Sequence, residues 1–377
     1  MKVAVPLERD AVESRVAASP ETVKKLKGLG LDVVIETGAG VKSRMPDQEY
    51  VAAGATIAAT TAEAVGDADI VLKVRRPTPD EAKGYKSGAI VIAIMDPWGQ
   101  KEALDAMAAA GVSAFAMEFM PRITRAQVMD VLSSQANLAG YQAVIDAAGT
   151  YDRAMPMMMT AAGTVPAARV FVMGAGVAGL QAIATARRLG AVVTATDVRP
   201  AAKEQVESLG AKFVAVEDEE FKQAETAAGY AKPMSAEYQA KQAALVAEHV
   251  KKQDIVITTA LIPGRPAPRL ISASMVASMK PGSVLIDLAV ERGGNVEGAV
   301  AGETVTTDNG VRIVGNLNVA GRIAASASAL YAKNLVAFLE IFFDKKDKSF
   351  KPNWDDELIK ATLITKDGAI VHPSLQS

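Results

Sequence analysis

One segment of the chain, residues 169–190, restricts the possible folds more than any other. Its sequence is RVFVMGAGVAGLQAIATARRLG, in which an apolar run leads into Gly174, Gly176 and Gly179 and then into a stretch of helical composition. This order predicts a buried strand, a tight turn and a helix. Gly174 permits the turn, Gly176 lets an anion approach the backbone, and Gly179 lets the helix pack close to the strand. The segment therefore predicts an α/β domain with an anion-binding turn.

The next predicted strand, AVVTATD, indicates which anion that turn takes. It ends at Asp197, 23 residues after Gly174, where a carboxylate can accept hydrogen bonds from both hydroxyls of an adenosine ribose. The charge of Asp197 repels a 2′-phosphate, so the site should prefer NAD(H). Arg199 can accommodate a 2′-phosphate, but we interpret it as capping the adenine or as solvated. The expected nucleotide contacts are Gly174, Ala175, Gly176, Val177, Gly179, Asp197, Val198 and Arg199.

Apolar runs of strand length alternate with helical stretches along the chain, which predicts two α/β domains with parallel sheets. In the first domain they are residues 3–6, 32–35, 70–74, 89–95 and 113–117. In the second they are residues 170–173, 192–196, 212–216, 255–259, 284–287 and 311–314. We expect two Rossmann-like domains, 1–133 with 321–377 and 134–320, separated by a cleft. Long helices over 124–148 and 323–342 should link them.

Composition and charge exclude several functions. The net charge is −2 with basic residues spread along the chain, so no basic face for nucleic acid is expected. Cysteine is absent and only His249 and His372 could supply imidazole, which argues against disulfides, thiolate catalysis and a metal site. The start, MKVAVPLERD, lacks the apolar core of a secretion signal, and no run of about 18 apolar residues follows. We expect a cytoplasmic chain without direct membrane insertion.

The two histidines also bear on the chemistry. A dehydrogenase that oxidises an alcohol or amine needs a group to accept the substrate proton, and neither His249 nor His372 lies beside the nucleotide motif. We expect both to be solvated or structural. Hydride transfer between two nicotinamide rings needs no such group, because the rate comes from holding two carbons in contact with water excluded. After the fourth strand, the Pro-rich loop 258–268 lies at a carboxyl end, with Leu261 as the expected contact.

These segments together resemble a known family, the NAD(H)-binding component (domain I, alpha subunit) of proton-translocating NAD(P) transhydrogenase. The similarity covers nearly the whole chain and includes residues 121–144, 159–170, 229–234, 258–268 and 279–295. It implies an enzyme that transfers a hydride between NADH and NADP⁺ held by a partner subunit. It also implies a homodimer, coupling to proton movement through membrane-spanning partner subunits, and a cytoplasmic location at the inner membrane through those partners.

The resemblance assigns further residues. PRITRAQVMDVLSS matches the family segment that contacts the nicotinamide end, which implicates Arg122, Ile123, Thr124, Gln127, Asp130 and Ser133. Gln127 would reach toward the partner's NADP(H) and act in catalysis; an exposed helix face is the alternative. GYAKPM resembles the mobile loop that folds over bound nucleotide, which implicates Gly229, Tyr230 and Met234, and Gln242 lies on the following helix. A plain surface loop is the alternative there.

Two other functions remain open on the sequence. Alanine dehydrogenase is a relative with the same two-domain fold, and Arg15 and Lys73 of this chain match its pattern. In that enzyme a catalytic histidine follows the strand equivalent to 89–95, where this chain has Met95, Asp96 and Pro97. We therefore interpret Arg15 and Lys73 as fold remnants or structural ion-pair partners and expect no alanine oxidation. The third possibility is an NAD-sensing regulatory module.

Overall fold

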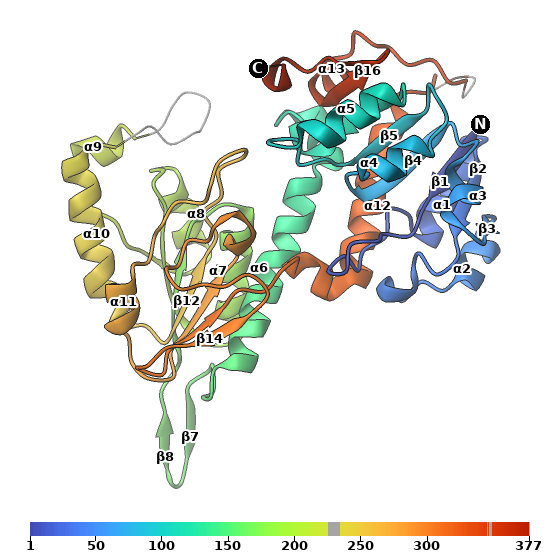
Figure 1. The fold of residues 1–377 in the computed structure, drawn as a ribbon. Coiled ribbons are helices and arrows are strands. Elements are labelled where there is room, and N and C mark those ends of the chain that lie inside the picture. Colours follow the sequence, from blue (N-terminus) through green and yellow to red (C-terminus); the bar gives the residue numbers. More distant parts are fainter. Residues whose placement is uncertain (225–233, 345, 347–348, 377) are drawn as a thin grey trace. The chain divides into compact units, whose positions relative to one another are not determined.

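The chain divides into two compact units in a computed structural model that describes residues 1–224, 234–344, 346 and 349–376 (Figure 1). Unit 1 comprises Met1–Gln135 and Ala320–Ser377, and unit 2 comprises Ala136–Val319. The C-terminal segment thus returns to unit 1 after the whole of unit 2. Each unit has its own sheet and its own buried core.

The sheet of unit 1 has the strand order β17-β16-β6-β5-β4-β1-β2-β3. The strands β1 to β6 pair in parallel: Lys2–Val5, Asp32–Glu36, Thr56–Ala58, Ile70–Arg75, Ile90–Ile94 and Ser113–Ala116. β16 (Leu363–Lys366) and β17 (Ala369–Ile370) extend the β6 edge with antiparallel pairings. The chain begins at the centre with β1 and builds outward in both directions, as in dinucleotide-binding folds.

The first helix, α1 (Pro20–Gly28), forms where its cap chemistry predicts. Ser19 accepts a hydrogen bond from the backbone N–H of Thr22, and Pro20 occupies the first turn. Val23 and Leu26 are buried against the sheet. The other helices of unit 1 are α2 (Asp47–Ala52), α3 (Thr61–Val65), α4 (Pro79–Lys83), α5 (Lys101–Ala109), α12 (Ala324–Glu340) and α13 (Glu357–Thr362).

Helix α12 joins the C-terminal segment of unit 1 to its core. Its aromatic side chain Phe338 lies edge-on to Phe115 of β6, with 5.6 Å between ring centroids, and Phe342 lies 5.3 Å from the same ring. Tyr331 is fully buried and donates to the carbonyl of Lys73 on β4 at 2.8 Å. This apolar contact fixes the C-terminal segment on the sheet.

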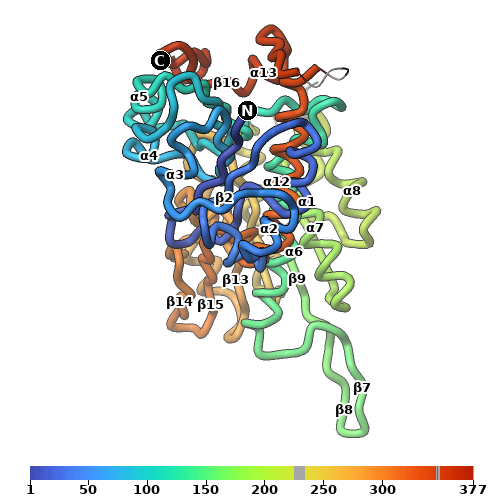
Figure 2. Tube along the Cα trace, turned by 90° about the vertical axis from the view of Figure 1, so that its right-hand side faces the viewer, coloured from blue at the N-terminus to red at the C-terminus, as the bar shows by residue number. Residues whose placement is uncertain are grey.

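The sheet of unit 2 repeats the order of unit 1 with β11-β10-β9-β12-β13-β15-β14. The parallel strands are β9 (Arg169–Met173), β10 (Val192–Thr196), β11 (Lys212–Phe213), β12 (Ile255–Thr258), β13 (Val284–Asp287) and β15 (Arg312–Val314), and β14 (Thr304–Thr306) is antiparallel. A separate hairpin, β7 (Met158–Thr160) and β8 (Gly163–Val165), extends away from this sheet in both views (Figures 1 and 2).

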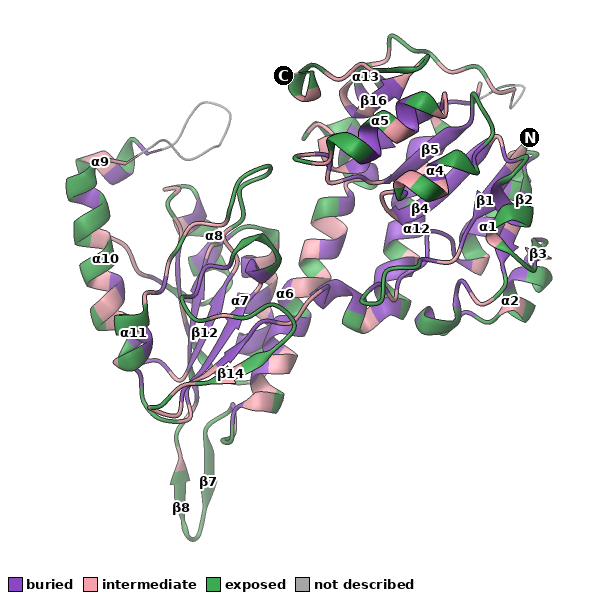
Figure 3. Cartoon of the chain, in the orientation of Figure 1, coloured by how far each residue is buried: buried purple, intermediate pink, exposed green. Residues whose placement is uncertain are grey.

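The helices that accompany the second sheet are α6 (Val131–Thr150), α7 (Val177–Arg188), α8 (Ala202–Ser208), α9 (Glu219–Lys222), α10 (Ala236–Val250) and α11 (Ala273–Ala277). The strands between them are buried (Figure 3). Among the described residues, no helix is both long enough and apolar enough to cross a membrane. The predicted fold class, α/β with parallel sheets of Rossmann type, is confirmed.

The expectation of one long helix over residues 124–148 is wrong at its start. Thr124–Met129 forms a 3₁₀ helix, η3, and α6 begins only at Val131. Asp130 separates them with a ψ of 92°, and its carboxylate accepts a hydrogen bond from the backbone N–H of Ser133 at 2.9 Å. An aspartate that caps a helix in this way has non-helical backbone angles, so the helix cannot continue backwards through it. Gln127 therefore lies on η3, before the long helix.

Candidate functional site

The loop after β9 turns where unit 2 changes strand direction, between β9 and β12. Gly174 has a φ of 104°, and a Cβ atom there would lie 2.4 Å from Thr259 Oγ1 in the loop after β12. The Thr259 hydroxyl donates to the carbonyl of Gly174 at 3.2 Å, and its backbone N–H donates to Met173 at 2.9 Å. Open α/β sheets bind ligands at the carboxyl ends of the strands that flank such a switch point. The two loops therefore form the floor of a candidate site.

The two remaining glycines of the motif meet different surroundings. A Cβ atom on Gly179 would lie 1.7 Å from the carbonyl oxygen of Gly174, so only glycine permits this contact of helix and strand. A Cβ atom on Gly176 would meet nothing within 4 Å. Gly176 is also the N-cap of α7 and makes no side-chain capping bond. The first N–H groups of α7 thus face open space, as a phosphate site at a helix N-terminus requires.

Sequence analysis missed two residues that build this loop. Gly140 of α6 packs against the start of α7, and a Cβ atom there would lie 2.0 Å from the carbonyl oxygen of Ala178. The other is Thr259, whose bonds to the glycine turn are described above. An isolated glycine inside a helical pattern could have indicated the close approach at Gly140, but the partner, 38 residues further along the chain, could not be inferred.

Asp197 follows β10 and bonds the glycine turn to the neighbouring strand. Its Oδ2 accepts from the backbone N–H of Ala175 at 2.8 Å and from Arg199 Nη2 at 3.1 Å. Its Oδ1 accepts from the backbone N–H and the Nε of Arg199, each at 2.9 Å. The expectation that Arg199 is solvated is therefore wrong, because an aspartate two residues away in sequence binds its guanidinium in a bidentate pair.

The other predicted contacts in unit 2 differ in their accessibility. Val177, Val198 and Leu261 are exposed. Gln242 of α10 is already engaged, since its Oε1 accepts from the N–H of Val216 at 2.9 Å and its Nε2 donates to Thr196 Oγ1 at 3.1 Å. Met234 packs on the core of unit 2. Gly229 and Tyr230 lie outside the described residues.

The residues predicted at the nicotinamide end lie on unit 1, on and beside η3. Arg122, Ile123, Thr124 and Gln127 are exposed. Ala126 and Met129 are buried beneath them, and Asn334 of α12 donates to the carbonyl of Val128 at 2.8 Å. Arg125 forms a bidentate pair with Asp356 at 2.7 and 2.8 Å. Asp130 and Ser133 bond to each other as the α6 cap. The segment is thus held from below and presents its outer side chains.

Unit 1 contains six charged residues that pair with one another, which we call the unit 1 ionic cluster: Glu8, Glu13, Arg15, Lys73, Arg75 and Glu81. Lys73 Nζ lies 3.4 Å from Glu8 and 3.0 Å from Glu81. Arg15 donates to both oxygens of Glu13 at 2.8 Å, and Arg75 Nε donates to Glu13 at 2.7 Å. The interpretation of Arg15 and Lys73 as ion-pair partners is confirmed.

Burial and pairing shift the two central carboxylates of this cluster in opposite directions. Burial raises the pKa of Glu8, against the opposing charge of Lys73. Burial alone would also raise the pKa of Glu13, but the hydrogen bonds and charge of Arg15, with Arg75, lower it to about 2. Glu13 is therefore held as a carboxylate by two arginines, whereas Glu8 has one lysine and one backbone donor, Val74, at 2.7 Å.

Both histidines make structural contacts. His249 Nε2 lies 2.8 Å from Thr194 Oγ1, and its ring lies edge-on to Phe171 at 4.7 Å. The His372 ring stacks on Phe119 at 4.5 Å. Burial lowers the pKa of each imidazole. Within the portion of the chain that the structure describes, no group of acidic or histidine side chains could hold a metal ion.

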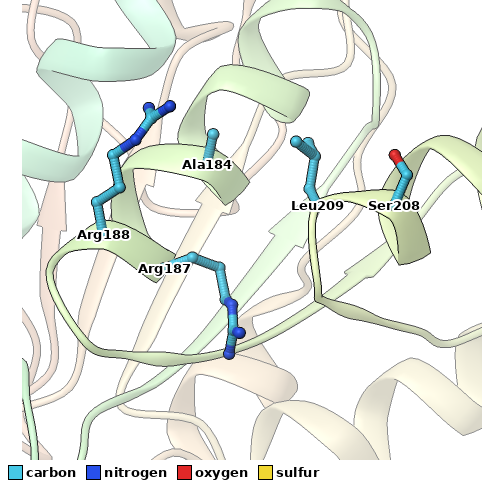
Figure 4. Close-up of a pocket in the computed structure, with 5 residues that line it drawn as sticks. All are labelled: Ala184, Arg187, Arg188, Ser208 and Leu209. Atoms are coloured by element: carbon cyan, nitrogen blue, oxygen red, sulfur yellow. The ribbon is translucent and has the colours of Figure 1, made fainter.

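A surface hollow of about 360 Å³ lies at the opposite end of α7 from the glycine turn (Figure 4). Arg187 and Arg188 of α7 line it with Ser208 and Leu209 at the end of α8. The two guanidinium groups point apart, and no group of the glycine turn takes part (Figure 4). The chemistry of the motif therefore lies at the other end of the helix.

Comparisons with known proteins cover both units. Residues 4–139 match the family model "Alanine dehydrogenase/PNT, N-terminal domain", and residues 143–373 match "Alanine dehydrogenase/PNT, C-terminal domain". The first portion of the NAD(P) transhydrogenase alpha subunit of Rhodospirillum rubrum, a separate chain, is 57% identical over 100% of this chain and 99% of its own length. An alanine dehydrogenase of Mycobacterium tuberculosis is 32% identical over 79% of this chain and 75% of its own length.

A solved structure shows the same relationship in three dimensions. The crystal structure of transhydrogenase from Sinorhizobium meliloti superimposes with a TM-score of 0.90 at 67% identity, covering 98% of this chain and 100% of that one. Sequence identity of this size over the full length leaves the fold and the family without an alternative. The chain therefore belongs to the alanine dehydrogenase/PNT family and, within it, to the NAD(P) transhydrogenase alpha subunits.

Proposed function

We propose that this chain is the NAD(H)-binding subunit of a proton-translocating transhydrogenase and passes a hydride directly between NADH and NADP⁺ held by a partner subunit. The observation that carries the proposal is the glycine turn after β9, with an uncapped helix N-terminus and open space in front of Gly176. A side chain at that position would fill the space that a pyrophosphate needs. The residues present therefore fit a dinucleotide.

The roles of the residues in unit 2 follow from this fit. The N–H groups at the start of α7 would bind the pyrophosphate, since they are uncapped and lie at the positive end of the helix dipole. Asp197 would accept hydrogen bonds from the adenosine ribose. Thr259 holds the turn in shape from the neighbouring loop. When bound, NAD(H) supplies the carbon that gives or takes the hydride, so the protein contributes binding, orientation and exclusion of water.

We assign Gln127 to the transfer step on the basis of its match to the family segment. Its side chain is exposed, and the backbone beneath it is held by Ala126, Met129 and Asn334. An exposed amide on a fixed segment can contact a nucleotide on another subunit. The reaction would depend on holding two carbons at near-attack distance, and a displacement of about 1 Å can cost on the order of 100-fold in rate.

The experiment is stopped-flow hydride transfer from NADH in a complex reconstituted with an NADP(H)-binding subunit. Gln127→Asn should slow transfer at least roughly tenfold while leaving NADH affinity nearly unchanged, because the shortened side chain no longer reaches across. Gln48→Asn, an exposed glutamine on α2, is the matched control and should transfer at the wild-type rate. Wild-type transfer in Gln127→Asn would withdraw the assignment, and no transfer in the wild-type complex would withdraw the proposed function.

The alternative of alanine oxidation is tested separately. The carboxyl end of β5 holds Asp96, with a φ of 42°, and the preceding Met95 donates its backbone N–H to Glu118 at 3.0 Å. Arg76 donates to the carbonyl of Asp96 at 2.8 Å. These contacts hold the loop in shape and bring no imidazole to it. Incubation with L-alanine and NAD⁺ should yield no NADH; steady production would favour the alanine dehydrogenase function instead.

We also propose the assembly that the family resemblance implies: a homodimer that docks an NADP(H)-binding subunit and is joined to the membrane through proton-channel subunits, on the cytoplasmic side. The Rhodospirillum relative is named as only a first portion of an alpha subunit, which supports a divided complex. The β7–β8 hairpin supports a protein interface, because Met157, Met158 and Met159 are exposed on it. Sedimentation of the purified chain tests the dimer, and a monomer at micromolar concentration would contradict it.

A further inference from the structure

The carboxylate of Asp197 is fully occupied by donors of the protein. A carboxylate offers about four acceptor positions, and four donors fill them here. They are the backbone N–H groups of Ala175 and Arg199 and the Nε and Nη2 of Arg199. The Asp197 side chain is only 7% exposed, and that of Arg199 is 31% exposed. The arginine therefore covers the acid that a ribose would have to reach.

A ribose with two free hydroxyls needs two acceptor positions on this carboxylate. The backbone donors belong to the glycine turn and to the residues after β10, so they cannot leave without changing the fold. The two side-chain bonds of Arg199 can be given up, because the guanidinium is partly exposed and its long side chain can rotate into solvent. The bonds that the ribose replaces are therefore those of Arg199.

We propose that Arg199 is an internal counter-ion of Asp197 that NADH must displace, so that this arginine lowers the affinity for NADH and narrows the discrimination against NADPH; the inference rests on the proposed function. While Arg199 is in place, the pair carries no net charge, and a 2′-phosphate meets a guanidinium beside the carboxylate. Without Arg199, the 2′-phosphate would meet an uncompensated carboxylate. Arg199 thus sets specificity through Asp197 and acts as a positioning residue.

The test is calorimetry of NADH and of NADPH binding to the purified full chain and to Arg199→Gln. Glutamine keeps polarity but cannot form the charged pair. We expect NADH to bind roughly three- to tenfold tighter and NADPH to bind no tighter than to wild type, the scale of a partly exposed charge-assisted pair. A merely structural role would weaken both nucleotides together. Arg199→Lys restores the charge and should return the NADPH-to-NADH ratio of dissociation constants toward that of wild type.

Two further variants separate the possible failures. Arg187→Gln removes an exposed arginine at the far end of α7 and should bind both nucleotides as wild type does. Asp197→Ala should weaken NADH binding. If Asp197→Ala weakens NADH while Arg199→Gln leaves it unchanged or weaker, the counter-ion inference is overturned and the nucleotide site stands. If wild type does not bind NADH, or Asp197→Ala binds it unchanged, the assignment of the site itself fails.

Discussion

The two units share one sheet order, and in each the first strand ends beside the strand where the order reverses. In unit 2 three residues, Gly174 to Gly176, separate β9 from α7. In unit 1 fourteen residues, 6–19, separate β1 from α1, and charged side chains of this loop pair with residues of β4. The same position in the fold therefore holds an open helix N-terminus in one unit and a closed ionic cluster in the other.

The acid at the end of the second strand is common to both units. Glu36 of β2 accepts from the backbone N–H of Leu7 at 2.8 Å, as Asp197 accepts from Ala175 at 2.8 Å. Each acid also pairs with an arginine, Arg9 in unit 1 and Arg199 in unit 2. An acid at this position thus braces the first loop whether or not a nucleotide binds. The short glycine turn, which leaves the helix N-terminus uncapped, is the feature that distinguishes the unit 2 site.

The largest test removes the centre of the unit 1 ionic cluster. Lys73→Met leaves the buried Glu8 without its counter-charge, and breaking a buried pair in this way typically costs about 3–5 kcal/mol. We expect the urea midpoint of unfolding to fall accordingly. Lys83→Met, at an exposed pair on α4, should change it little. Partial recovery in the double variant Lys73→Met with Glu8→Gln would confirm the cause, and an unchanged midpoint in Lys73→Met would show that the cluster does not stabilise unit 1.

The second test uses pH to isolate Glu13. Its pKa lies at about 2 in the folded chain, below its ordinary value of 4.5, so its ionisation stabilises the fold fully above pH 4.5 and less as the pH falls toward 2. The raised pKa of Glu8 acts in the opposite sense, since stability then falls as pH rises above 4.5. At neutral pH, Glu13→Gln should cost about 3 kcal/mol.

The gap between wild type and Glu13→Gln should narrow by about 1.4 kcal/mol for each pH unit below 4.5, as measured by urea unfolding at a series of pH values. Glu102→Gln, at an exposed position of α5, should run parallel to wild type throughout. A gap that stayed constant down to pH 3 would mean that Arg15 and Arg75 do not hold Glu13 ionised.

Sequence reasoning recovered the features of this comparison that depend on local pattern. The apolar runs gave the central strands of both sheets, and Ser19 and Pro20 marked the start of α1, because strand alternation and helix capping are short-range effects. The glycine motif located the turn in unit 2 for the same reason. The short strands β3, β14, β16 and β17 were missed, since segments of two to four residues carry too little periodicity.

Contacts between distant residues could not be predicted. Arg15 donates to Gln135 at 2.9 Å, 120 residues away, and nothing in either local sequence specifies that pairing. The acid Asp130 was taken for a nucleotide contact within a helix, whereas its carboxylate begins the helix. Arg199 was interpreted without its partner Asp197, although the two lie two residues apart, because a rotamer rather than the sequence decides whether they meet.

The third test changes the glycine that faces open space. Gly176→Ala meets no atom within 4 Å in the protein, so folding should be unaffected, whereas the methyl group would occupy the space proposed for the pyrophosphate. Overpacking of this kind costs about 1–3 kcal/mol, which is roughly a 5- to 150-fold loss of NADH affinity. Calorimetry is the measurement. Gly149→Ala on α6 also meets nothing within 4 Å and is the control. Wild-type affinity in Gly176→Ala would remove the turn from the site.

The smallest test asks whether the arginine of unit 1 does what we propose for the arginine of unit 2. Arg9 is 55% exposed and pairs with Glu36, which keeps two other donors, the N–H of Leu7 and the hydroxyl of Thr61. Exposed ion pairs contribute about 0–1 kcal/mol, so Arg9→Gln should lower the thermal midpoint by a few degrees at most. NADH affinity should be the same as in wild type, because no ligand competes for Glu36. If Arg9→Gln tightened NADH binding as Arg199→Gln is expected to, the effect would come from removing positive charge anywhere in the chain, and the parallel between the two acid–arginine pairs would lose its meaning for specificity.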